Sequence, residues 1–274
     1  MKVSLTVNIV VDDRISNDFK NFAWNIFFKS KGRGLTFEQH FPWIQSGTSF
    51  WTVEARENER LIGGLIVREL EICYGSRVEL IGCIGLVCVD SLYRGKGIAN
   101  QLFKTLIETA SIKKYGALTL WTNQHHIYES KGFFVSDESL SGTVTAPESV
   151  CHSLGTAFIC ENLPNHIGLP PFAISGRIYK SKEANITVIR DHNSYIVSDW
   201  SGSDNNVCSL IKDVLPESFR IHTQYKCSLV KFLSTLGYSI NLSPVNLQMW
   251  LKLKSDLEIT LITKSSNFNI LNRI

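Results

Sequence analysis

The stretch "IGLVCVDSLYRGKGIANQLF", residues 84–103, places glycines and cations between an apolar run and a helical pattern. Residues 80–89 are apolar and end at Asp90, as a buried strand does. Apolar residues then recur at helical spacing from Ile98 onwards. The glycine loop between them, Arg94-Gly95-Lys96-Gly97, allows close approach to a backbone whose helix N-terminus exposes unpaired amides. The sequence therefore predicts a site for an anionic group such as phosphate.

A simpler alternative exists for the glycine loop. A strand-to-helix turn also uses glycine for positive φ and exposes cations to solvent. The context favours a site, because the loop follows a long apolar strand and opens an amphipathic helix. A further motif, "IYESKGF" at residues 127–133, follows at a suitable distance.

Together these stretches resemble the GCN5-related N-acetyltransferase (GNAT) superfamily. Residues 94–99 match its R/Q-x-x-G-x-G/A loop, and residues 128–133 are similar to its Tyr-x-x-x-Gly-Phe signature. The resemblance covers roughly residues 1–138. It implies an α/β fold with a mixed, mostly antiparallel and splayed central sheet flanked by helices, and transfer of an acetyl group from acetyl-CoA to an amine.

The resemblance also implies roles for individual residues. Backbone groups of Val87, Cys88 and Val89 would pair with the pantetheine arm. The residues expected to hold the pyrophosphate are Arg94, Gly95, Lys96, Gly97, Ile98 and Ala99. Tyr128 would protonate the departing thiolate, since a phenol with a pKa of about 10 can donate a proton there. The Val89 amide could hold the oxyanion that forms during attack. The alternative for Tyr128 is packing on a helix face.

One position departs from the family. Many members place an asparagine seven residues before this tyrosine, where this chain has Trp121. Asn123 is nearer, and a shortened turn would let it contact the cofactor.

The base that removes the amine proton is left open by the sequence. The candidates are Glu79, His125, His126 and the thiols of Cys83 and Cys88. Histidine titrates near neutral pH. Adjacent histidines at the start of a helix are often capping residues, however, and Glu79 is as readily a charge at a strand edge. A chain of water molecules is the further alternative.

The expected organisation has three parts. Residues 1–140 form the acetyl-CoA-binding domain, with the order β-α-α-β-β-β-α-β-α-β. Residues 141–180 form a connection with one strand pair. Residues 181–274 repeat part of the first domain, since "SYIVSDWSGSDNNVCSLIKDVL" and "CSLVKFLSTLGYSI" again suggest strand, loop and helix, and a helix that ends on Leu-Gly-Tyr.

The repeat is expected to be degenerate. Its loop, "DWSGSDNN", carries Asp199 and Asp204 in place of cations, and Leu233 stands where Tyr128 would be. Such a loop repels pyrophosphate. The second domain is therefore expected to form one wall of the acceptor site, or to serve only stability and packing.

The composition and charge of the chain exclude several classes of function. The chain has 274 residues, a formal net charge of +3 and a pI near 8.4, and residues 1–140 hold 16 Lys/Arg against 15 Asp/Glu. Without a long basic run, nucleic acid is a poor partner. No apolar run approaches the roughly 20 residues of a membrane helix, and no signal peptide is evident. Seven scattered cysteines without a C-x-x-C pair indicate a reduced, cytoplasmic chain with no disulfide framework and no metal.

The leading hypothesis is thus an N-acetyltransferase for the primary amine of a small molecule. The overall arrangement most resembles bacterial enzymes that acetylate a dTDP-linked 3-amino-3,6-dideoxy sugar; an aminoglycoside, polyamine or peptide N-terminus is the alternative acceptor. Other hypotheses are a non-catalytic acyl-CoA sensor and an interaction scaffold of two degraded copies.

Overall fold

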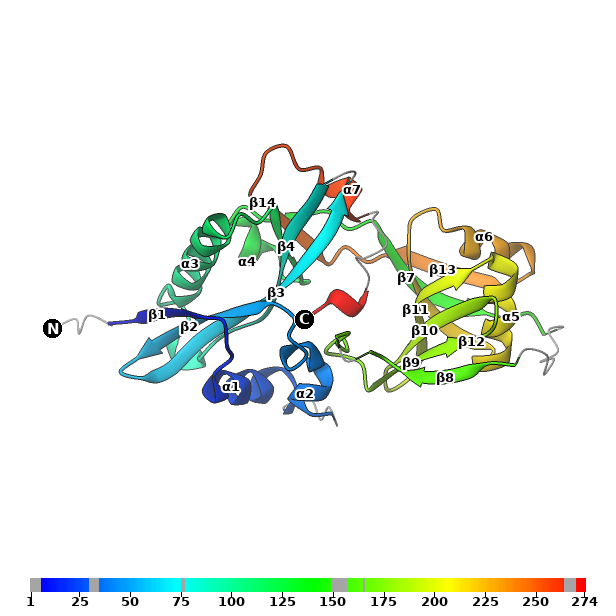
Figure 1. Cartoon of the computed structure of the whole chain (residues 1–274), viewed down its shortest axis with the longest axis horizontal. Coiled ribbons are helices and arrows are strands. Elements are labelled where there is room, and N and C mark those ends of the chain that lie inside the picture. The colour runs from blue at the N-terminus through cyan, green and yellow to red at the C-terminus, as the bar shows by residue number, and fades with distance from the viewer. Residues whose placement is uncertain (1–5, 30–34, 75–76, 149–156, 165, 264–269) are drawn as a thin grey trace.

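The chain forms two mixed sheets of seven strands each, which lie side by side along the long axis of the molecule (Figure 1). This computed structural model describes residues 6–29, 35–74, 77–148, 157–164, 166–263 and 270–274. Helices flank both sheets, so the predicted α/β class is confirmed. None of the helices in the described residues is both long and apolar enough to cross a membrane.

The first half follows the element order predicted from the sequence. Its elements are β1 (Asn8–Asp12), α1 (Asn17–Phe27), α2 (Phe37–His40), η2 (Pro42–Ile44), β2 (Phe50–Glu57), β3 (Arg60–Tyr74), β4 (Arg77–Val89), η3 (Ser91–Tyr93), α3 (Ile98–Ile112), β5 (Ala117–Trp121), α4 (His125–Glu129) and β6 (Phe134–Val135). The β2–β3 hairpin turns through Asn58 and Glu59, both at positive φ. Two such residues in a row suit the right-handed twist of a hairpin.

The second half repeats the pattern without the early helices. Its elements are β7 (Ser139–Thr145), β8 (Ile159–Asn162), β9 (Ser175–Lys180), β10 (Ala184–Arg190), β11 (Tyr195–Gly202), α5 (Asp204–Val214), β12 (Ser218–Gln224), α6 (Ser228–Thr235), β13 (Ser239–Pro244), β14 (Gln248–Lys252), α7 (Ile259–Thr263) and η4 (Ile270–Asn272). The strand pair expected in the connection is β8 with β9.

If β1–β7 are taken as the first copy and β8–β14 as the second, each sheet contains one strand from the other copy. β14 lies between β5 and β6 in the first sheet, whose order is β1-β2-β3-β4-β5-β14-β6. β7 lies between β12 and β13 in the second, whose order is β13-β7-β12-β11-β10-β9-β8. The expected division into residues 1–140, 141–180 and 181–274 therefore does not follow the sheets. Sequence reasoning missed this exchange of strands.

The two sheets have the same topology, strand for strand. Read from β1, the first sheet corresponds to β8-β9-β10-β11-β12-β7-β13 of the second. The likeness extends to single hydrogen bonds: Phe133 N donates to Tyr128 O at 3.3 Å, and Tyr238 N donates to Leu233 O at 3.1 Å. A glycine at positive φ precedes each donor. The internal duplication is thereby confirmed, with Leu233 equivalent to Tyr128.

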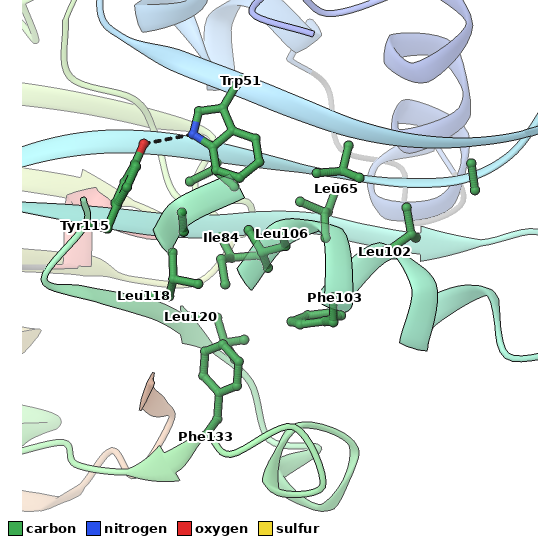
Figure 2. Packing of buried hydrophobic residues seen from close by; sticks show 14 of the residues in the cluster. Trp51, Leu65, Ile84, Leu102, Phe103, Leu106, Tyr115, Leu118, Leu120 and Phe133 are labelled. Carbon is green, nitrogen blue, oxygen red and sulfur yellow. Dashed lines mark hydrogen bonds between the residues drawn. The ribbon is translucent and has the colours of Figure 1, made fainter. Parts of the chain in front are cut away.

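Both faces of the first sheet are covered, which accounts for the unbroken apolar run of β4. On one face, α3 contributes Leu102, Phe103 and Leu106 to a core that includes Leu65 and Ile84 of the sheet (Figure 2). In the same core the Trp51 indole donates to the Tyr115 hydroxyl at 2.8 Å (Figure 2). On the other face, α1 and α2 bury an aromatic cluster that includes Phe19, Phe37 and Phe41.

A segment near the end of the described chain, residues 270–274, lies between the two units (Figure 1). Ile270 and Leu271 are buried in a cluster with residues of the second sheet. Ile274 packs against the first sheet beside Gly85, where an added Cβ would come within 2.4 Å of the Ile274 side chain. The segment thus connects the cores of the two units.

Asp137 holds the two exchanged strands together at the point where they cross. Its carboxylate accepts hydrogen bonds from the amide and hydroxyl of Ser139, at the start of β7, and from the amides of Leu247 and Gln248, at the start of β14. Burial alone would raise the pKa of Asp137, but these hydrogen bonds outweigh it and hold the pKa below its usual value. The ionised carboxylate is therefore part of the folded structure.

Asp137→Ala is expected to lower the free energy of unfolding by about 2–4 kcal/mol, because buried donors lose their acceptor. Since the folded pKa is lowered, the contribution is present above the unfolded value of about 3.9 and is lost as the pH falls through the folded one. Urea titrations at neutral and acidic pH measure it. Asp13→Ala, at an exposed aspartate, is the control. Equal losses in both variants would contradict the role of Asp137.

Candidate active site

The site begins where β4 and β5 part. The two strands are parallel and pair at only three positions, Ile81–Cys83 with Ala117–Thr119. β4 continues to Val89, and no described strand pairs with its β5 side beyond Cys83. Val87, Cys88 and Val89 lie in this unpaired stretch. An unpaired strand edge of this kind accepts an extended ligand through backbone hydrogen bonds.

A bulge in β4 accompanies the divergence. Gly64 of β3 is opposite Cys88 and Ile66 is opposite Gly85, so β4 has one extra residue in this interval. Leu86, within the bulge, has a φ of 52°, which is rare for a branched residue. Bulges bend a strand and are common beside active sites.

The glycine loop, residues 94–97, is open and faces solvent. Gly95 and Gly97 have φ of 75° and 80°, and a Cβ added at either would meet nothing within 4 Å. The amides of Gly95, Gly97, Ile98 and Ala99 donate no hydrogen bond to another described residue. α3 also has no side-chain cap. A hollow of about 340 Å³ lies over this loop and reaches Val89.

The two cations of the loop differ in their contacts. Arg94 Nε donates to Val89 O at 3.3 Å, which ties the loop to the end of β4. Lys96 lies over the ring of Tyr93, with its Nζ 4.7 Å from the ring centroid. The Tyr93 hydroxyl in turn donates to the Glu57 carboxylate. Both cations are exposed, so they bring positive charge to the open amides.

Tyr128 lies on α4 and packs against α3. Its ring meets Phe103 edge-on at 5.5 Å and Phe133 at 6.2 Å between centroids. Burial raises the pKa of Tyr128. Its hydroxyl makes no hydrogen bond to any described residue. The side chain therefore has an anchored ring and an uncommitted O–H group.

Glu79 lies at the other end of β4, two residues after the strand begins. Its side chain is buried, and its Oε2 lies 2.7 Å from Lys254 Nζ. The loop after β14 is thereby tied to the first sheet. This ion pair gives Glu79 a structural role, well before the point at which β4 leaves β5.

The thiols considered as bases are packed in the core. Cys83 and Cys88 are both buried, and burial raises the pKa of each to about 12. They therefore stay protonated at neutral pH. All the cysteines in the described residues are free, and Cys151 lies outside those residues.

The polar residues near Tyr128 lie at the start of α4. His125 is three residues before Tyr128, on the same face of the helix. Its Nε2 is buried without a hydrogen-bond partner among the described residues, whereas His126 is exposed. Asn123 is also exposed, and its Oδ1 accepts a long bond of 3.5 Å from Gln124. Trp121, at the position of the family asparagine, packs against an apolar cluster.

The equivalent loop of the second unit is closed. A Cβ added at Gly202 would come within 2.5 Å of Glu183 O. Ser203 caps α5 by accepting a bond from the Asn206 amide, and Asp204 lies in the first turn. At the position of Tyr128, Leu233 is fully buried. The second copy thus has neither the open amides nor the phenol of the first.

Arg68 of β3 is a site residue that sequence reasoning missed. It is buried opposite Cys83, donates to His166 O at 2.9 Å and lies over the ring of Trp43. Burial lowers its pKa. A cavity of about 460 Å³ extends from Arg68 to β9–β11 of the second sheet. The only signal in the sequence was an arginine within an apolar strand. An arginine at the edge of a sheet would give the same pattern.

The acetyltransferase (GNAT) domain family matches residues 27–135. This range contains the diverging strands, the glycine loop and Tyr128. Residues 27–135 are thus similar to GNAT domains. Because GNAT domains use acetyl-CoA, the open loop has the chemistry expected for the diphosphate of that substrate.

One curated relative of the chain is the N-acetylaspartate synthetase of Xenopus tropicalis, with 32% identity over 94 residues. The match covers 32% of this chain and 32% of that protein. It therefore spans about a third of the relative's length.

Solved structures extend the likeness to nearly the whole chain. A probable N-acyltransferase from Enterococcus faecalis has a TM-score of 0.64 at 13% identity and covers 89% of this chain and 72% of its own. A GCN5-related N-acetyltransferase from Kribbella flavida has a TM-score of 0.62 at 11% identity, with 90% and 71% covered. A putative acetyltransferase from Pyrococcus horikoshii covers 97% of this chain and 94% of its own, with a TM-score of 0.56 at 13% identity. At these identities the likeness shows the fold, and the predicted GNAT fold with a second GNAT-like unit is confirmed.

Gly97→Asp is expected to abolish acetyl-CoA binding, because it puts a carboxylate and a strained L-residue among the open amides. Isothermal titration calorimetry with acetyl-CoA measures the loss. Gly47→Asp is a matched control, since Gly47 has a φ of 75° and nothing within 4 Å of an added Cβ. Unchanged affinity in Gly97→Asp, or equal losses in both variants, would remove the loop from the binding site.

Proposed function

We propose that the chain is an acetyl-CoA-dependent N-acetyltransferase that acts on the primary amine of a small molecule. The observation that supports this proposal is that an open, cationic amide loop directly follows the edge of β4 that pairs with no described strand. The match of residues 27–135, which contain both features, to the GNAT domain family supports the proposal. The second unit lacks the cationic glycine loop, so a single cofactor site per chain is proposed.

The residues proposed to hold acetyl-CoA follow the path from strand to helix. Backbone groups of residues 87–89 would pair with the pantetheine arm, and the amides of residues 95–99 would surround the pyrophosphate. Arg94 and Lys96 add charge, and Asn123 is a further proposed contact at the end of β5. When bound, acetyl-CoA supplies an activated acetyl group as a thioester.

Two groups of the chain are proposed to act on the reacting atoms. The Val89 amide lies at the end of the unpaired edge and would donate to the oxygen on which negative charge develops. Tyr128 would donate its proton to the leaving sulfur. The raised pKa of Tyr128 keeps the phenol protonated at neutral pH, and its hydroxyl has no competing partner among the described residues.

The contacts of the candidate residues reduce the number of groups that could act as the base. Glu79 is engaged by Lys254, and the buried thiols of Cys83 and Cys88 stay protonated. We therefore propose His125, through its unpartnered Nε2, or water as the group that accepts the amine proton. His125 is favoured by its place on the same helix face as Tyr128.

The acceptor is proposed to bind between the two units. The cavity that starts at Arg68 has walls from both sheets and includes Lys180, Glu71 and Asp199. Its two cations suit the diphosphate of a nucleotide-linked sugar, so a dTDP-linked 3-amino-3,6-dideoxy sugar is the specific acceptor we propose. The name of the Xenopus tropicalis relative adds an amino acid, aspartate, to the amines worth testing.

Tyr128→Phe is expected to lower kcat by roughly 10²–10⁴-fold at near-constant KM, as loss of a general acid does. Steady-state kinetics with acetyl-CoA measure the effect. Tyr225→Phe is the control, since Tyr225 is exposed on the second unit. A loss under about threefold would assign the Tyr128 phenol to packing, because a general acid contributes far more.

Release of free CoA, followed with Ellman's reagent, tests the reaction itself. The amine panel contains a dTDP-amino sugar, an aminoglycoside, a polyamine, aspartate and a peptide. At least one amine is expected to raise CoA release above hydrolysis, and Tyr128→Phe to suppress it. If no amine does so while acetyl-CoA still binds by calorimetry, the chain is an acyl-CoA sensor. If acetyl-CoA does not bind either, the transferase proposal fails in favour of a scaffold.

A further inference from the structure

A second cavity, of about 400 Å³, lies against the second sheet. Its walls come from β7, β11, β12 and β13, and from η4 of the segment between the units. It opens on the face of the second sheet opposite α5 and α6, whose core includes Phe219 and Ile221. It is therefore separate from the closed loop of the second copy, which precedes α5.

Three basic side chains line this cavity: Arg220 and His222 of β12, and Arg273 after η4. Arg220 and His222 alternate with the core residues of β12 and so share the face that the cavity occupies. Arg220 is half exposed, with Nη2 donating to Ser141 Oγ at 3.4 Å and Nη1 lying 3.8 Å from Asp191 Oδ2. Its guanidinium keeps donors free for a further partner.

The side chains of Arg273 and His222 have no hydrogen-bond partner among the described residues; His222 is buried, whereas Arg273 is partly buried. The Nε of Arg273 is inaccessible to solvent and unsatisfied, and its guanidinium makes no ion pair or hydrogen bond to a described residue. Burial lowers the pKa of Arg273 to about 10, so it stays charged at neutral pH. Burial lowers the pKa of His222 to about 3, so that ring is neutral, with one N–H to donate. A guanidinium whose Nε is out of contact with solvent and unsatisfied is stabilised when an anion supplies the missing acceptor.

The acidic neighbours are already engaged. Asp191 accepts hydrogen bonds from the amides of Asn193 and Ser194 and from the Ser194 hydroxyl. Asp137, which attracts Arg273 electrostatically, is held by the donors at the starts of β7 and β14. The cavity therefore has more hydrogen-bond donors than acceptors.

The equivalent place in the first unit is occupied by two tryptophans, Trp121 and Trp250, and by the polar residues Thr119 and Gln248. In the first sheet, Trp121 of β5 is opposite Gln248 of β14. The corresponding pair in the second sheet is His222 of β12 and Ser141 of β7. Two residues earlier on β5, Thr119 is opposite the fully buried Trp250 of β14. At the corresponding pair in the second unit, Arg220 of β12 is opposite Thr143 of β7. Large rings in one copy are thus replaced by donors around a cavity in the other. Stability alone does not call for this change, because apolar packing would serve it as well.

We propose that this cavity binds an oxyanion, the carboxylate or phosphate group of a small molecule, through Arg220, Arg273 and His222. Planar guanidinium groups bind both kinds of group in a bidentate manner. The anion supplies the acceptors that these donors lack. Binding here does not depend on the transferase reaction, and the loop of the first unit takes no part in it.

Calorimetric titration with inorganic phosphate and with succinate tests this. The full chain is used with Arg94→Gln added, so that the glycine loop does not contribute. We expect at least one probe to bind, and the one that binds identifies the anion as phosphate or carboxylate. Arg220→Gln is expected to weaken that binding at least tenfold, or about 1.4 kcal/mol. Arg177→Gln, at an exposed arginine on β9 of the same sheet, is the control and is expected to leave binding within about twofold.

Either of two results would overturn the proposal. It fails if neither probe binds at concentrations up to about 10 mM, weaker than any specific site of interest. It also fails if Arg220→Gln binds as tightly as the control. Arg273→Gln gives a second measurement, with circular dichroism to confirm folding. If that variant unfolds, Arg220→Gln decides alone, since the Arg220 side chain is 42% exposed and tolerates replacement.

Discussion

The structure depends on one constraint, the early parting of two parallel strands. β4 and β5 share only three paired positions before they separate. The remaining backbone of β4 then faces an opening, and the chain turns at its end into the glycine loop and α3. A bulge in β4 and the different lengths of β4 and β5 produce this arrangement. Residues 87–89, which are proposed to pair with the pantetheine arm, lie along that opening.

The second sheet shows how a duplicated architecture diverges. β11 and β12 also part after a short parallel pairing, so the opening is inherited. In the second copy, however, Ser203 caps the helix and Gly202 lies against the backbone of Glu183. On the face opposite α5, His222 and Thr143 stand where the first unit has Trp121 and Trp250, and Arg220 stands where it has Thr119. One copy has thus kept the open loop, while the other has acquired a basic cavity on a different face.

Local features of the fold were predictable from the sequence, whereas pairings distant in the sequence were not. The loop at residues 94–99 and the helix at residues 125–129 follow from glycine placement and periodicity, and the structure has both. The exchange of β7 and β14 depends on contacts between distant segments, which periodicity does not encode. Glu79 illustrates the same limit, because its partner Lys254 is 175 residues away in sequence. Arg273 and Arg68 were missed for this reason too.

The exchanged strands also affect how the protein is made. While the first 247 residues are being synthesised, the first sheet has a vacant position between β5 and β6, since β14 has not yet left the ribosome. The first unit is therefore expected to complete its fold only after nearly all of the second has been translated. A nascent chain with an unfilled sheet position is open to pairing with other chains. Strand exchange thus makes the first unit dependent, during synthesis, on the copy that lacks the open glycine loop.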